Sequence, residues 1–192
     1  MNVSRDEAVE ALDVIARSRD QMLTLRRYAR FAPFLLIWGA VWMVANGVTD
    51  FAPAWSGPAW LGSSGVGLIA SILWGMHLGR RSRARADEGV RRGVWVPRVV
   101  MLGLAICCYF PVMFVVLGPL AARQANAFAS LFWAFAYMFA GAWVGWRLFA
   151  IGAVAAAAVV FGYLTIGPHY YLWMAACGGG TLIAGGLWLR KI

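Results

Sequence analysis

The side chains of this sequence that could carry out acid–base chemistry lie at the ends of apolar runs. Asp50 follows the first run, one helical turn after Asn46, and His169 with Tyr170 begins the last run. If folding brings these ends together, Asp50 and His169 could form a pH-responsive pair or bind a polar ligand. They could serve as an acid–base pair only within about 3 Å of each other, beside a pocket. The alternative is that all four are interfacial residues facing headgroups or water.

Signatures of hydrolytic enzymes and of metal sites are missing from the sequence. There is no G-x-S-x-G and no H-E-x-x-H, and no Asp, Glu, Lys or Arg lies in the middle of an apolar run. Cys107 and Cys108 are adjacent and Cys177 stands alone, so no C-x-x-C spacing occurs. The glycines 178–180 lack the Lys of a phosphate loop. We therefore expect no cofactor, no metal and no enzymatic activity.

The composition predicts that these residues are positioned by membrane-spanning elements. Hydrophobic residues make up 62% of the 192-residue chain and charged residues 13%. Soluble domains average roughly 45–50% and about 25% respectively. The mean hydropathy is +0.69. A soluble fold of this size could not bury that much apolar surface, so a bilayer is the expected solvent.

Six apolar runs follow a charged N-terminal segment, and each is near the roughly 20 residues that a spanning helix needs. The expected fold class is an all-α integral membrane protein with six transmembrane helices preceded by a cytosolic amphipathic helix. The expected domains are the N-terminal helix at 1–31 and the transmembrane region at 32–192, whose spans are 32–49, 60–78, 95–117, 126–146, 148–166 and 169–189. Pro111 is expected to kink the third span.

The distribution of basic residues predicts the orientation. With a cytosolic N-terminus, every Arg and Lys except Arg123 lies in or beside a cytosolic segment. The opposite orientation would violate the positive-inside bias. Both termini are therefore expected in the cytosol.

One connector, between the second and third spans, is rich in arginine. Because spans flank it on both sides, it is a tethered loop and not a nucleic-acid-binding arm. Its expected contacts are anionic lipid headgroups or a protein partner. The arginines concerned are Arg80, Arg81, Arg83, Arg85, Arg91 and Arg92.

The N-terminal segment has a modest apolar stripe. Leu12, Ile15 and Met22 recur at helical intervals, and Arg19 interrupts them. Such a stripe could cover the protein's own cytosolic loop, pair with a second copy to form a homo-oligomer, or lie on the membrane surface.

Small residues recur at helical spacing in the second and sixth spans, which lets helix backbones approach closely. They could line a narrow pathway or a dimer seam, or serve ordinary packing within one chain. These residues are Ser64, Gly67, Ser71, Gly75, Thr181 and Gly185.

The motifs "WGAVW" (38–42) and "YLWMAACGGGTLIAGGLWLRK" (171–191) resemble a loose group of uncharacterised bacterial six-span inner-membrane proteins. This resemblance implies a bacterial cytoplasmic membrane and no particular activity. Because nearly all polar and charged residues that could contact a partner lie on the cytosolic face, the sequence favours a non-enzymatic regulatory or assembly module acting through that face. The alternative is a small transporter or channel-like protein, which predicts a polar cavity between helices reaching toward Asn46, Asp50 and His169.

Overall fold

The computed structural model describes residues 5–83, 108–109, 112–113, 115–118 and 120–191. This part of the chain is helical and contains no strand. Its elements are α1 (Arg5–Phe51), η1 (Pro53–Trp55), α2 (Ser56–Arg83), α4 (Ala122–Val144), α5 (Trp146–Thr165), α6 (Tyr170–Trp173), η2 (Met174–Gly179) and α7 (Gly180–Arg190).

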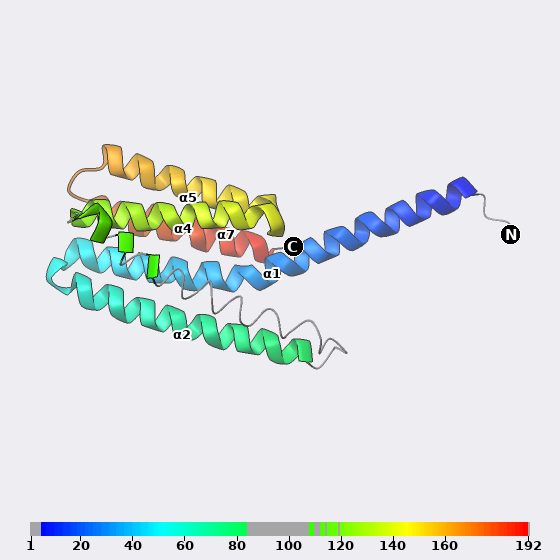
Figure 1. The fold of residues 1–192 in the computed structure, drawn as a ribbon, viewed down its shortest axis with the longest axis horizontal. Helices are drawn as coiled ribbons and strands as arrows, with labels where there is room; N and C mark the ends of the chain where they lie inside the picture. The colour runs from blue at the N-terminus through cyan, green and yellow to red at the C-terminus, as the bar shows by residue number, and fades with distance from the viewer. Residues whose placement is uncertain (1–4, 84–107, 110–111, 114, 119, 192) are drawn as a thin grey trace.

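The long helices lie side by side in a bundle, from which the N-terminal half of α1 projects (Figure 1). α1 packs against α2, η2 and α7, and α4 packs against α5. The α1–α2 and α5–α6 connections meet at one end of the bundle, called here the Asp50 end. The C-terminus, the α4–α5 turn and the end of α2 lie at the other, basic end (Figure 1).

The first helix continues without a break from the N-terminal segment into the bundle. It is 47 residues long and carries Pro33 inside it. The sequence analysis had placed a domain boundary between residues 31 and 32. Pro33 is the one helix-breaking residue near that boundary, where no glycine occurs. The helix continues through Pro33.

Five helical segments of the described residues are long and apolar enough to cross a membrane, which suggests a multi-pass membrane protein. They are Leu12–Phe51, Pro53–Arg80, Ala122–Val144, Trp146–Thr165 and Tyr170–Arg190. They correspond to the first, second, fourth, fifth and sixth predicted spans. The third, at 95–117, lies mostly outside the described residues, and so does Pro111 with its predicted kink.

Glycines allow α1 to approach the C-terminal helix closely. A Cβ on Gly39 would lie 2.9 Å from the Gly179 carbonyl oxygen, and a Cβ on Gly179 would lie 2.9 Å from that of Gly39. About two turns later, a Cβ on Gly186 would lie 3.0 Å from the Ala32 carbonyl oxygen. Any larger side chain at these positions would push the two backbones apart. The glycines of the last span therefore set its distance from α1.

The small residues predicted to pack helices differ in what they contact in the structure. A Cβ on Gly67 would lie 2.7 Å from Val41 of α1, and one on Gly185 would lie 2.8 Å from Ile151 of α5. Gly75 has open space around it among the described residues. Thr181 of α7 donates a hydrogen bond of 2.6 Å to the Cys177 carbonyl of η2, one turn before it. Ser71 has a buried hydroxyl with no hydrogen-bond partner among the described residues, whereas Ser64 lines the cavity described below.

At the basic end, α1 holds the turn between α4 and α5. Gly145 forms this turn with a φ of 140°, a conformation that favours glycine. Arg27 donates a hydrogen bond of 2.8 Å to the Trp143 carbonyl, and the Tyr28 hydroxyl lies 3.4 Å from the Arg147 backbone nitrogen. These contacts tie α1 to the α4–α5 pair where the interface between them is otherwise small.

The arginine-rich loop falls largely outside the described residues. Arg80 is exposed near the end of α2. Arg81 and Arg83 belong to the same helix, but the placement of their side chains is not described. Arg85, Arg91 and Arg92 lie outside the described residues. The lipid or partner contacts of this loop therefore remain a prediction.

Candidate ligand-binding site

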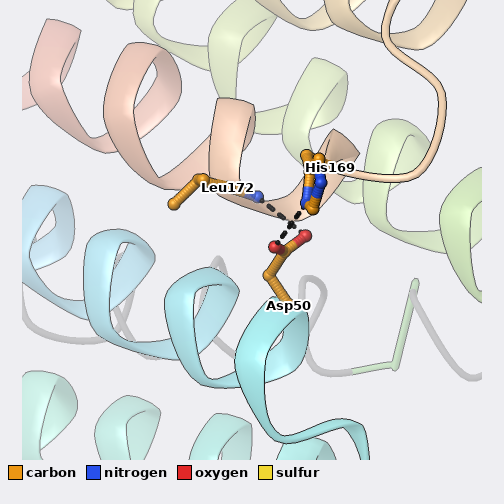
Figure 2. Close-up of polar contacts among 3 residues, drawn as sticks. All are labelled: Asp50, His169 and Leu172. Atoms are coloured by element: carbon orange, nitrogen blue, oxygen red, sulfur yellow. Dashed lines mark hydrogen bonds and ion pairs between the residues drawn. The ribbon is translucent and has the colours of Figure 1, made fainter.

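The Asp50 end brings two residues of the predicted polar cluster into contact. Asp50 lies near the end of α1, and His169 immediately precedes α6. The His169 Nδ1 is 3.3 Å from Asp50 Oδ2, and the Leu172 backbone N–H donates to Asp50 Oδ1 at 3.3 Å (Figure 2). The first-turn amides of a helix lack partners within it, so Asp50 caps the start of α6 from another element.

The two partners differ in their contact with solvent. The Asp50 side chain is 5% exposed, whereas that of His169 is 73% exposed. A carboxylate withdrawn from water interacts more strongly with any nearby cation than an exposed one does. Asp50 is thus the recessed member of the pair, and His169 is its outer neighbour.

Asn46 and Tyr170 lie together in a second, more deeply buried group that the sequence analysis did not separate from the first. Asn126 of α4 joins them: its Nδ2 donates to Asn46 Oδ1 at 2.9 Å, and the Tyr170 hydroxyl donates to its Oδ1 at 3.2 Å. Asn46 also donates to the Trp42 carbonyl at 3.0 Å. The exposed fractions of Asn46 and Tyr170 are 0% and 1%. This chain of hydrogen bonds links α1, α4 and α6.

Arg123, the one basic residue predicted to lie away from the cytosolic face, binds the C-terminal end of α5. Its Nη2 donates to the carbonyls of Tyr163 and Ile166, both at 2.5 Å, and is 3.3 Å from that of Gly162. Its guanidinium also lies 4.8 Å from the ring centroid of Tyr170. The last carbonyls of a helix carry partial negative charge, which a cation stabilises. The sequence analysis gave Arg123 no such role.

A cavity of about 760 Å³ lies between α1, α2 and α4 and reaches the Asp50 end. Pro53 and Pro168, from the two connecting segments at this end, line its outer part. Its volume falls within the range of roughly 300–1,000 Å³ that is typical of small-molecule sites. It is bounded by three helices and two turns, and it is open on part of its surface.

The walls of the cavity are mainly apolar and combine aromatic, proline and alanine residues with polar groups. The aromatic lining residues are Trp38, Trp42, Trp60, Trp133 and Tyr171, and the polar ones are Thr49, Asp50, Ser56, Ser64, Asn126 and Ser130. Apolar walls with a small number of polar groups are the usual make-up of a ligand pocket. Among the described lining residues, Asp50 is the sole charged side chain.

The Asp50–His169 contact by itself does not make a hydrolytic site. Its separation of 3.3 Å is near the distance that an acid–base pair would need. Among the described residues, however, the His169 ring hydrogen-bonds to Asp50 alone, so no Ser, Thr or Cys is held against it as an activated nucleophile. In the same part of the chain no three His, Cys, Asp or Glu side chains converge on a metal position.

Comparison with known proteins gives no relative: no family model, no curated protein and no solved structure matches the chain. The resemblance to bacterial six-span proteins therefore rests on its Trp- and Gly-rich motifs alone. The site has to be interpreted from its own geometry.

Proposed function

We propose that this protein is a small transporter or channel-like membrane protein that takes a small molecule into the aromatic cavity at the Asp50 end. The observation that carries the proposal is the cavity itself, because a purely structural bundle has no need to keep such a volume between its helices. The sequence alone favoured an assembly module acting through the basic face. The cavity, lined by Asp50 and adjacent to the Asn46–Asn126–Tyr170 group, supports the transporter-like alternative.

We propose further that the protein lies in a bacterial cytoplasmic membrane with both termini in the cytosol. The charge distribution supports this orientation. Arg147, Arg190 and Lys191 lie at the basic end, with the arginines of the N-terminal half of α1 beyond it, whereas Arg123 lies at the Asp50 end. Basic residues accumulate on the cytosolic side and interact there with anionic headgroups. The cavity would then be reached from the side of the membrane away from the cytosol.

Thiol labelling tests whether the cavity admits water. In a variant whose native cysteines are replaced by serine, Ala129→Cys places a thiol on the cavity wall. We expect a charged, membrane-impermeant thiol reagent, added from the non-cytosolic side of oriented vesicles, to modify this cysteine. The modified fraction is measured by mass spectrometry.

Two further cysteines provide the controls. Ala54 is exposed in η1 at the same end, so Ala54→Cys should react fully. Ala155 is 2% exposed between packed helices, so Ala155→Cys should not react. If Ala54→Cys reacts and Ala129→Cys is as inert as Ala155→Cys, the proposal of a solvent-accessible cavity is wrong.

A second candidate function, assembly with another copy or a cytosolic partner, is favoured by one specific observation. The projecting half of α1 exposes large apolar side chains, with Leu12 65%, Ile15 63% and Met22 63% exposed. Exposed apolar side chains that share one helix face are typical of interaction sites, although Arg19 interrupts this face. Deleting residues 2–24 should abolish higher-order complexes while membrane insertion persists, as measured by light scattering coupled to size-exclusion chromatography. Complexes of unchanged size after the deletion would exclude this role for the helix.

A further inference from the structure

We propose that the ligand of the aromatic cavity is a lipophilic organic cation, whose charge is balanced by Asp50 and whose apolar groups lie between the tryptophans. The inference rests on the proposed function, since it names the class of molecule that the same cavity would accept. It follows from three features of the cavity: its charge, its walls and its length.

The charge of the described lining is negative. Asp50 is 5% exposed and lines the cavity. Its hydrogen-bond partners there are the Leu172 backbone N–H and the His169 ring. Arg123, the basic residue of this end, directs its guanidinium to the carbonyls that end α5 and is absent from the cavity lining. Among the described residues no Lys or Arg lines the cavity beside this recessed carboxylate, which therefore attracts cations and repels anions.

The aromatic walls favour a cation over a neutral apolar molecule. Trp38 and Trp133, from α1 and α4, stack with their ring centroids 6.4 Å apart and an interplanar angle of 19°. Trp60 and Tyr171 line the cavity from α2 and α6. Indole faces attract organic cations by about 0.5–2 kcal/mol each, with the larger values at desolvated sites. Trp38 and Trp133 each turn one face toward the other, so the aromatic surface that remains for a delocalised positive charge is shared among Trp60, Tyr171 and the unstacked parts of this pair.

The length of the cavity suits a molecule larger than a metal ion. Asp50 and Trp38 are both on α1 and both line the cavity, and a helix places residues twelve positions apart about 18 Å from each other. Two hydroxyls of the lining, those of Thr49 and Ser56, are hydrogen-bonded to each other at 2.9 Å. Small inorganic cations prefer a shell of several oxygen ligands, whereas this lining offers one carboxylate and extended aromatic surface.

Two probes of the same shape and opposite charge test the inference directly. Tetraphenylphosphonium and tetraphenylborate would be titrated separately into the purified full-length protein in an uncharged detergent, with protein-free micelles as the blank. Isothermal titration calorimetry should give at least tenfold tighter binding of the cation. Because this comparison uses the wild-type protein, it does not depend on any variant folding.

Variants then locate the site. Asp50→Asn should weaken binding of tetraphenylphosphonium at least tenfold, because the amide can still accept from Leu172 but carries no charge. Trp133→Ala should weaken it severalfold by removing one aromatic wall. Asp13→Asn, a matched loss of one carboxylate on the exposed part of α1, should leave the affinity unchanged.

The outcomes separate this inference from the function on which it rests. Equal affinity for the two probes, preference for the borate, or unchanged binding in Asp50→Asn would overturn the inference of a cationic ligand. If Ala129→Cys is labelled in that case, the accessible cavity stands and accepts another class of molecule. If neither probe binds and Ala129→Cys is not labelled, both proposals are wrong.

Discussion

At the scale of single residues, Asn126 joins the buried polar group of the Asp50 end. Its amide is the partner of both the Asn46 carbonyl oxygen and the Tyr170 hydroxyl. Asn126→Ala leaves these two buried groups without that partner, which typically destabilises a protein by about 1–3 kcal/mol. We expect a lower free energy of unfolding, measured by denaturant titration in detergent. Thr165→Ala, which removes a hydroxyl bonded only within its own helix, should have a much smaller effect. A fully stable Asn126→Ala protein would show that the group is not structural.

The contacts of Arg123 predict a second effect on stability at this scale. Arg123→Gln removes the charge that binds the final carbonyls of α5 and the contact with the Tyr170 ring. Hydrogen bonds to charged groups contribute roughly 1.5–3 kcal/mol, so we expect a loss of stability in that range. Arg190→Gln, an exposed arginine at the end of α7, serves as the control and should change stability little. The same small change in both variants would contradict the role given to Arg123.

The polar cluster could be inferred from the sequence only in part, for a physical reason. Asn46, Asp50, His169 and Tyr170 were recognised because each lies near the end of an apolar run, where polar side chains stand out. Asn126 was missed although it begins the fourth predicted span, because neither its residue type nor its position shows that its amide meets Asn46 and Tyr170 from two other helices. The partition into an outer pair and a buried group depends on helix rotation, which residue type does not encode.

At the scale of elements, adjacent glycines in the last span give a matched comparison. A Cβ on Gly179 would lie 2.9 Å from the Gly39 carbonyl oxygen and 3.0 Å from the Met43 nitrogen, whereas one on Gly180 has nothing within 4 Å. We expect Gly179→Ala to destabilise the bundle by roughly 1–3 kcal/mol through overpacking. Gly180→Ala should be neutral or stabilising by up to about 1 kcal/mol, because alanine is the better helix former. Thermal unfolding in detergent measures both, and equal effects would contradict the close α1–η2 contact.

The elements themselves were more accessible to sequence reasoning than their contacts. Long apolar runs set the positions of α2, α4 and α5 because a helix is the one form that satisfies the backbone of such a run. The stripe of small residues in α2 was a weaker guide: Gly67 approaches α1, but Gly75 meets open space among the described residues and Ser64 lines the cavity. Spacing shows that residues share a helix face, but not which neighbour that face meets.

At the scale of the whole molecule, the projecting half of α1 is the feature with the clearest consequence for assembly. Leu12, Ile15, Arg19 and Met22 follow the alternating steps of three and four residues that form a coiled-coil seam, and Arg19 interrupts it. Arg19→Leu would complete the seam. Burying a leucine contributes about 1.5–3 kcal/mol in each chain, so self-association should strengthen at least tenfold, as measured by sedimentation in detergent.

The control for this prediction is the same chemical change on another face of the helix. Arg17 is also exposed, but it is two residues from Ile15 and therefore points about 200° around the helix from it. Arg17→Leu adds the same apolar area outside the seam and should leave association unchanged. If both variants associate equally, the effect is non-specific stickiness and the helix has no defined seam. If Arg19→Leu alone associates, the projecting helix pairs through the face that its apolar residues define, independently of the cavity at the opposite end.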